Sequence, residues 1–285
     1  MGKKSAQVVL IADLHVGSTI GLCNPVVGLD DGGEYHFNSL QKLEYDYWTR
    51  EFWPYVWANE KKDKRKTIVI GNGDMVDGDH HGTFQTWTRN IDEQENECAK
   101  LLEPIAKRAS RVYMTRGTPA HVLPSASSDE QVARKIKAQK FTKEPLNTRT
   151  HSTFHLSLDV YGVLFNVAHH GPNPGTRMWT YGSTLRSYCK TIVFDAMCQG
   201  ARPPDVVIRS HVHKRTWETI RDYGHVCECL ITPAWQWKTE YAHRVASHED
   251  VAHVGGVIVE IDDGKISKIE FKLLPIRQTD VEVIV

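Results

Sequence analysis

Five short apolar runs, each followed by an Asp or a His in the next loop, constrain this chain more than any other feature of its sequence. Each run has the length of a β-strand and is rich in β-branched residues, which is typical of strands covered on both faces. Helical patterns separate the runs, and strands that alternate with helices predict an α/β layered fold. The runs lie at residues 8–12, 67–71, 111–115, 162–168 and 205–209.

The helical segments have recognisable ends. Residues 91–109 place their apolar side chains near one helical face. Ser128–Gln131 read as a capping box, which predicts a helix that reaches about Lys140. Gly200 stands where a glycine would stop the helix predicted over residues 183–199.

The C-terminal part predicts a β-hairpin, because Asp263-Gly264 lies between two alternating segments within residues 255–274. No linker or repeat divides the chain, so we expect a single domain over residues 1–285 with an insertion at about 18–60. The insertion ends in YDYWTREFWPYVW. This aromatic stretch is either a helix packed on the body or a cap over the site, where aromatic rings would stack on bases.

The composition narrows the function classes. The 35 basic and 35 acidic residues cancel, so net charge gives no support for nucleic-acid binding, and the one basic run, residues 61–66, is interpreted as a solvated loop. The start has no apolar signal region, and no apolar run approaches the ~18 residues of a membrane span. The six cysteines lack metal or secreted-framework spacing, which favours reduced thiols in a cytoplasmic enzyme.

The residues after the apolar runs are metal-ligand types. On a strand, residues i and i+2 point to the same side, so a D-x-H or H-x-H pair at a strand end would converge. Ligands collect at the carboxyl ends of strands in open α/β sheets, and carboxylates and imidazoles bind divalent metals. In chain order the candidates are Asp13, His15, Asp74, His121, His169, His170, His211 and His213. Two ions about 3.5–4 Å apart, bridged by Asp74, would suit phosphoryl transfer.

The order D-x-H, G-D, a Gly-His motif, H and S-H-x-H resembles the calcineurin-like metallophosphoesterase superfamily over residues 8–215. The resemblance extends to its DNA-repair exonuclease branch. It implies an α/β, four-layer αββα sandwich with two mixed β-sheets flanked by helices. It also implies two divalent metal ions, with Mn²⁺ expected first and Zn²⁺, Fe or Mg²⁺ as alternatives.

By the same resemblance, the first ion would be held by Asp13, His15, Asp74 and His213, and the second by Asp74, His169 and His211. His170 is an alternative to His169, which we prefer because it follows the apolar run directly.

The third motif, GTPAH, departs from the family pattern G-N-H-D/E. Thr118 stands where the ligand Asn is expected, and its hydroxyl would be a weaker metal ligand. Pro119 stands where the family has the His that assists the leaving group. His121 is our candidate for the catalytic acid in its place; the other interpretation is a loop imidazole that lines the cleft.

The second motif departs from the protein-phosphatase signature, because Gly78 is followed by Asp79 and not by Arg. We therefore do not expect a Ser/Thr protein phosphatase. The acidic and histidine residues of this loop are either solvated turn residues or partners that orient metal-bound imidazoles: Asp77, Asp79, His80 and His81. Arg116 and Arg209, next to motif residues, either face a phosphate or lie at the surface.

The function that these motifs indicate is a dimetal-dependent phosphoester hydrolase, a phosphodiesterase or nuclease that uses a metal-bound hydroxide. Its expected partner is a phosphoester substrate, with nucleic acid and nucleotides among the candidates, and no membrane. The alternatives are a small-molecule phosphomonoesterase or phosphodiesterase and a catalytically degenerate metal- or nucleic-acid-binding module. Oligomeric state does not follow from the sequence.

Overall fold

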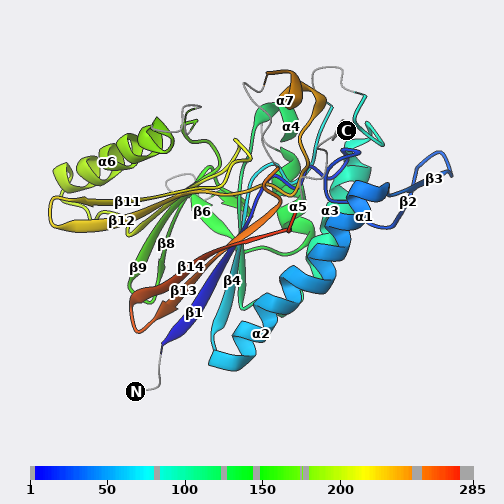
Figure 1. The fold of residues 1–285 in the computed structure, drawn as a ribbon. Coiled ribbons are helices and arrows are strands. Elements are labelled where there is room, and N and C mark those ends of the chain that lie inside the picture. The colour runs from blue at the N-terminus through cyan, green and yellow to red at the C-terminus, as the bar shows by residue number, and fades with distance from the viewer. Residues whose placement is uncertain are drawn as a thin grey trace, which may run out of the picture.

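The helices and strands form four layers, as Figure 1 shows. The computed structural model describes residues 4–79, 84–122, 127–143, 148–173, 175, 180–245 and 252–276. Helix α6 (Ser183–Cys198) covers one outer face, two five-stranded sheets form the two middle layers, and the remaining long helices cover the other face. The predicted α/β class and the four-layer sandwich with two mixed sheets are confirmed.

The first sheet is mixed. Strands β1, β4 and β5 are parallel, and β13 pairs with β1 in the antiparallel sense, with Val8 opposite both Ile68 and Val259. The C-terminal hairpin is therefore confirmed as the edge of this sheet, and Asp263 and Gly264 turn it with φ of 48° and 81°. In sheet order the strands are β14 (Lys265–Leu273), β13 (Gly255–Asp262), β1 (Ser5–Ile11), β4 (Lys66–Asn72) and β5 (Arg111–Thr115).

The second sheet is also mixed. Its central strand β10 is parallel to both of its neighbours, and the two edge strands are antiparallel to theirs. The inner faces of the two sheets share one apolar core, in which Val8 and Leu10 meet Phe165 and Ile208. In sheet order the strands are β11 (Thr216–Asp222), β12 (His225–Ile231), β10 (Val206–Arg209), β9 (Val163–Ala168) and β8 (His155–Val160).

The helices largely follow the predicted pattern. The capping-box prediction is wrong in detail, because α5 begins at Ser127 and ends at Lys135, and Lys137 then takes a left-handed φ of 57° that ends helical geometry. Gly200 follows α6 with φ of 66°, as predicted for a helix stop. The other elements are α3 (Ile91–Arg108), α4 (Pro119–Val122), α7 (Glu240–Val245), β6 (Phe141–Lys143) and β7 (Thr148–Thr150).

The aromatic stretch packs on the outer face of the first sheet. Trp48 is 2% exposed and Trp53 is 4% exposed, and the Trp48 ring lies 4.6 Å from that of Trp235. The aromatic-cap interpretation is wrong for these rings, and the interpretation as a helix packed on the body is right. The elements over the predicted insertion, about residues 18–60, are β2 (Val26–Gly28), β3 (Glu34–His36), α1 (Ser39–Tyr47), a π-helical turn η1 (Trp48–Phe52) and α2 (Trp53–Asp63), which runs slightly past it.

Among the described residues, no helix combines the length and apolar character needed to cross a membrane.

Candidate metal centre

The loops after β1, β4 and β10 carry backbone in the left-handed region. Ten non-glycine residues of the described chain have positive φ, and half of them are candidate metal ligands: Asp13, His15, Asp74, His211 and His213. Such backbone costs on the order of 1–3 kcal/mol at each residue and gathers at functional sites. The expectation that D-x-H and H-x-H converge through strand alternation is therefore wrong, because β1 ends at Ile11 and β10 at Arg209. Left-handed turns bring these side chains together instead.

Two glycines let the loops approach each other. A Cβ on Gly73, whose φ is 82°, would lie 2.5 Å from His169 Nδ1. A Cβ on Gly117 would lie 2.1 Å from Asp74 Oδ1. Only glycine fits at these contacts, which explains the glycine of the second and third motifs in physical terms.

Asp13, His15 and His213 form the first ligand group. His213 Nε2 lies 3.2 Å from Asp13 Oδ1 and 3.3 Å from His15 Nε2. Asp13 Oδ1 is buried, and neither its contact with His213 nor any other contact with the described residues has the geometry of a hydrogen bond. A buried carboxylate oxygen without a partner, faced by two imidazole nitrogens, fits a divalent cation well.

Asp74, His169 and His211 form the second group. Asp74 Oδ2 lies 2.9 Å from His169 Nε2 and 3.9 Å from His211 Nδ1. His169 Nδ1 lies 2.6 Å from the carbonyl oxygen of Asn72, which turns Nε2 towards the site. His169 Nε2 is also 3.8 Å from Asp13 Oδ1, so the two groups are contiguous. This geometry supports His169 as the inward-facing member of the His169–His170 pair.

Thr118 lies inside the second group. Its backbone N–H donates to Asp74 Oδ1 over 2.6 Å, and its hydroxyl donates to Asp74 Oδ2 over 3.0 Å. The structure thus brings the unusual residue of the third motif into direct contact with the carboxylate that the two groups would share.

His121 also reaches the site. Its ring lies edge-on to that of His15 at 4.4 Å between centroids, and one of its nitrogens is within 4.8 Å of ligand atoms of His15 and Asp74. His121 Nδ1 lies 2.8 Å from the carbonyl oxygen of Asp77. The side chain of Asp77, Oδ1, lies 3.2 Å from His15 Nδ1. Asp77 therefore orients both imidazoles, in agreement with the interpretation that this loop supplies partners for the histidines of the site.

Asp79, in the same loop, has a different partner. It pairs with Arg89, and His80 and His81 lie outside the described residues.

The charges of the ion-free site offset one another. Burial alone would raise the pKa of Asp13 and Asp74, but the imidazoles around them, His213 and His169 for Asp13 and chiefly His169 for Asp74, hold both pKa values below the ordinary value. Burial alone would lower the pKa of His169, but Asp74 and Asp13 raise it to about 10. The imidazole of His169 and the two carboxylates thus compensate one another, and a metal ion bound there would take the place of a proton on His169.

A buried polar network beneath the ligands was not foreseen from the sequence. The amide of Asn72 donates to the carbonyl oxygen of Ala168 over 3.1 Å and to the Ser210 hydroxyl over 2.6 Å. It accepts from the Thr115 hydroxyl over 2.6 Å, and Ser210 continues the network to Thr232 over 2.7 Å. Because these residues end strands of both sheets, the network fixes the loops relative to one another. A small polar residue at the end of each of four apolar strands is the sequence signal that could have predicted this network.

Asp129 was interpreted only as part of a helix cap, yet it links two of the motifs. Its carboxylate accepts from the backbone N–H of Met75 over 3.1 Å and of Gly117 over 2.7 Å. Burial, and then the nearby Asp74, raise the pKa of Asp129 to about 7. The residue holds the loops that carry Asp74 and Thr118, and nothing in the sequence distinguishes it from an ordinary helix-start Asp.

The two arginines next to motif residues, Arg116 and Arg209, donate hydrogen bonds to other groups of the protein. Arg209 is 2% exposed and donates to Asn166 and to the carbonyl oxygen of Ile208. Arg116 donates to the Ser152 hydroxyl over 2.8 Å. Arg209 is therefore neither a surface charge nor a phosphate-facing group, and it supports β9 and β10 from within.

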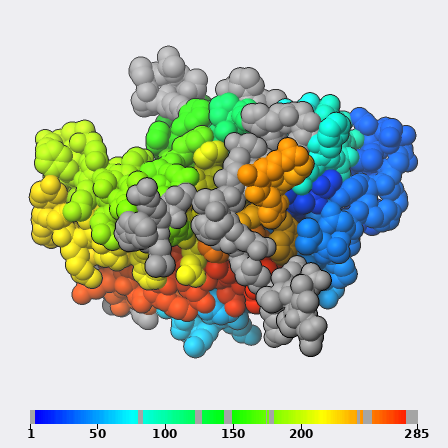
Figure 2. Space-filling model, turned by 45° about the horizontal axis from the view of Figure 1, so that its top comes forward, coloured from blue at the N-terminus to red at the C-terminus, as the bar shows by residue number. Residues whose placement is uncertain are grey.

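The carboxyl ends of β1 and β4 point to the top of Figure 1, the side that Figure 2 brings forward. In Figure 2 the orange atoms of α7 lie between the green and yellow half, with the second sheet and α6, and the blue and cyan half, with α1 and α2. The site therefore lies on the side where the two halves of the sandwich meet.

Comparisons with solved structures find proteins of similar fold at low identity. A conserved uncharacterized protein from Streptococcus pneumoniae TIGR4, titled a predicted phosphoesterase, is 10% identical, with 96% of this chain and 91% of that chain covered at a TM-score of 0.37. A metallophosphoesterase from Sphaerobacter thermophilus is 11% identical over 95% and 89% of the two chains, with a TM-score of 0.36. Vps29 from Entamoeba histolytica, complexed with Zn²⁺, is 12% identical over 94% and 99%, with a TM-score of 0.35.

No protein-family model and no curated protein matches the chain. The four layers and the chain order of the candidate ligands are those that the resemblance to the calcineurin-like metallophosphoesterase superfamily implies.

Proposed function

We propose that this chain is a metal-dependent phosphoester hydrolase that works with two divalent ions, for which Mn²⁺ is the first candidate. The observation that carries the proposal is the meeting of two ligand groups at one shared carboxylate, Asp74. When bound, two such ions stabilise the charge that develops on a phosphoryl group and bring the pKa of water close to neutrality. The ligands would be Asp13, His15, Asp74 and His213 for one ion, and Asp74, His169 and His211 for the other, with the Thr118 hydroxyl beside the second.

The protein's own contribution is to aim these ligands before an ion arrives. Asp77 faces Nδ1 of His15, and the Asn72 carbonyl oxygen accepts from Nδ1 of His169. In both histidines the contact at Nδ1 leaves Nε2 directed towards the site. Partners of this kind set the tautomer and the orientation of metal-binding histidines.

His121 is the proton donor of this proposal. A carbonyl oxygen can only accept a hydrogen bond, so the contact with the Asp77 oxygen places a proton on Nδ1 of His121. Nε2 is then the nitrogen that gains or gives up a proton. Held next to the ligands, His121 can protonate a departing alkoxide, a role worth roughly 10²–10⁴-fold in rate.

Phosphodiesters, including those of nucleic acids and nucleotides, are the substrate class that we favour. A diester carries one negative charge fewer than a monoester dianion and needs fewer cationic groups around it. Arg116 and Arg209 are both held by protein groups, which supports the less charged substrate. The buried Trp48 and Trp53 give no support to base stacking.

A substrate panel tests the proposal. With saturating Mn²⁺, we expect bis(p-nitrophenyl) phosphate to be hydrolysed with a kcat/KM well above that for p-nitrophenyl phosphate. DNA, RNA, cyclic nucleotides and nucleotides then refine the class, with Asp74→Asn as the inactive control. Faster monoester turnover would overturn the diester assignment and leave the small-molecule phosphomonoesterase.

One observation favours a second candidate, a degenerate metal- or nucleic-acid-binding module. The third motif has Thr118 and Pro119 where the resemblance places a ligand and an acid. A chain that binds two ions but turns over neither aryl ester would support this module over the hydrolase.

A further inference from the structure

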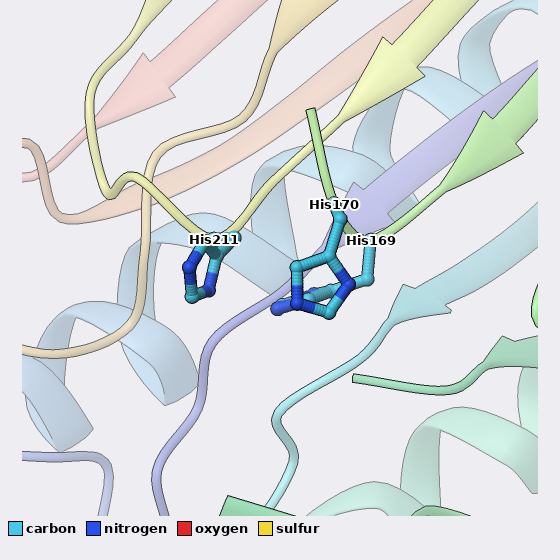
Figure 3. A group of neighbouring side chains, drawn as sticks. All are labelled: His169, His170 and His211. Atoms are coloured by element: carbon cyan, nitrogen blue, oxygen red, sulfur yellow. The ribbon is translucent and has the colours of Figure 1, made fainter. Parts of the chain in front are cut away.

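His170 is the imidazole of the site that neither the expected ligand sets nor the proposed acid uses. It follows His169 directly, and its side chain is exposed to solvent. Its ring centroid lies 4.8 Å from that of His211 and 5.0 Å from that of His169. Figure 3 shows the three rings gathered at one place, with His211 coming from the loop after β10. One nitrogen from each of the three lies within 4.8 Å of the others.

The Thr118 hydroxyl marks the middle of this histidine cluster. Its Oγ1 lies 3.3 Å from His169 Nε2, 3.3 Å from His170 Nε2 and 3.0 Å from His211 Nδ1. Its single proton goes to Asp74 Oδ2, which also lies 2.9 Å from His169 Nε2. Three imidazole nitrogens and a carboxylate oxygen thus surround one point, and this is a donor set that binds a divalent cation.

We propose that His170 binds the second metal ion through Nε2, so that three histidines and Asp74 hold this position. The inference rests on the proposed function, because it concerns one of that site's two ions. The third motif has a hydroxyl where the resemblance places an amide ligand, and His170 supplies the replacement from the neighbouring loop. His169 and His170, which were predicted as alternative ligands, would then both bind the second ion.

This ligand set changes the metal preference of the second position. The first position combines two carboxylates with two imidazoles, whereas the second combines one carboxylate with three imidazoles. Imidazole suits Zn²⁺, Co²⁺ and Fe²⁺, and carboxylate oxygen suits Mn²⁺ and Mg²⁺. The second position should therefore favour Zn²⁺ over Mn²⁺ more strongly than the first position does.

Metal binding to His170→Ala tests the assignment without an activity readout. The wild-type chain and the variant are titrated with Co²⁺, followed by d–d absorption, and with Zn²⁺ and Mn²⁺ by calorimetry. We expect the first ion to bind as in the wild type, and the second at least about tenfold more weakly with an altered Co²⁺ spectrum. His36→Ala is the matched control, because that side chain is 66% exposed and lies outside the cluster.

A second variant, His170→Gln, replaces the ring nitrogen by an amide oxygen at similar reach. We expect it to restore binding of a second ion while shifting the preference from Zn²⁺ towards Mn²⁺. If the wild-type chain binds two ions and both variants bind them with wild-type affinity, the His170 assignment is overturned and the proposed function stands. If the wild-type chain binds fewer than two ions, the proposed function is wrong, and the assignment of His170 to the second ion is wrong as well.

Discussion

The strand-end loops and the aromatic helices are both buried, but they are built in opposite ways. The loops bury carboxylates and imidazoles on left-handed backbone, held by networks around Asn72 and Asp129. The continuous helical segment of α1, η1 and α2 buries aromatic rings on right-handed backbone: Trp48 packs against Trp53, and both Trp48 and Phe52 pack against Trp235. The strained backbone of the loops positions the candidate ligands, whereas the aromatic packing of the helices stabilises the fold.

The two regions meet at Trp235. Its ring packs on Trp48, while its backbone N–H donates to the carbonyl oxygen of Asp13 over 3.0 Å. The aromatic core thus supports the loop that carries the first ligand. If this division is right, substitutions in the loops chiefly change metal binding and turnover, and substitutions in the helices chiefly change stability.

The largest effect is expected for Asp74→Asn. The substitution removes the negative charge that both ions would share, so hydrolysis should fall to the level of the reaction without enzyme. The ion-free chain should still fold, with a lower free energy of unfolding, because the buried His169 loses one carboxylate partner and keeps Asp13 as the other. Activity assays alongside urea unfolding check both parts. Turnover that survives the substitution would contradict the shared role of Asp74.

His121→Ala should come next. With a poor, alkoxide-like leaving group, loss of the proton donor should lower kcat by roughly 10²–10⁴-fold, whereas a p-nitrophenolate leaving group needs little protonation and should suffer less. Both ions should still bind. Equal losses on the two substrates would assign His121 to charge stabilisation, and no loss on either would remove it from the mechanism, leaving His80 or His81 as the next candidate.

Trp48→Ala probes the other region. Removal of a buried indole should lower the free energy of unfolding by about 3–5 kcal/mol. KM should stay the same for nucleotide substrates and for a small aryl ester, because the ring lies in the core. Calorimetric melting and kinetics on both substrates measure this. A selective rise in KM for nucleotides would instead restore the aromatic-cap interpretation.

The smallest effect concerns Glu44, one helical turn before Trp48. Both of its carboxylate oxygens are buried without a hydrogen-bond partner among the described residues, and burial raises its pKa well above the ordinary value of 4.5. The folded chain therefore keeps this proton at pH values where the unfolded chain has lost it, so stability should fall as pH rises above about 4.5 towards the folded pKa.

Glu44→Gln removes that proton equilibrium. The free energy of unfolding of the variant, relative to the wild type, should therefore increase from pH 5 to pH 9. Urea unfolding at several pH values in this range checks the trend. Parallel curves for the two proteins would show that Glu44 is not the source of the slope.

Much of the architecture was readable from local patterns. The run at 111–115 matches β5 residue for residue, and the Asp263-Gly264 turn and the Gly200 stop are where they were predicted. The gathering of Asp13, Asp74, His169 and His213 was also readable, because apolar runs that end in ligand residues share one edge of a layered fold.

The remaining features depend on contacts between distant segments. Strand alternation explained the approach of Asp13 and His15 wrongly, since the turn geometry of their loop is set by bonds to Gly73 and Asp74. The contacts of Asp129 with Met75 and of Asn72 with Ser210 span 54 and 138 residues, so no local pattern encodes them. The burial of the aromatic stretch likewise follows from Trp235, nearly 200 residues away.

The most direct test of the account is the metal stoichiometry of the wild-type chain at saturating Mn²⁺, combined with its electron paramagnetic resonance spectrum. Two ions that share the Asp74 carboxylate should give two Mn²⁺ per chain and an exchange-coupled signal, and Asp74→Asn should lose the coupling. At most one ion per chain, or two ions with uncoupled signals, would contradict a centre built around Asp74.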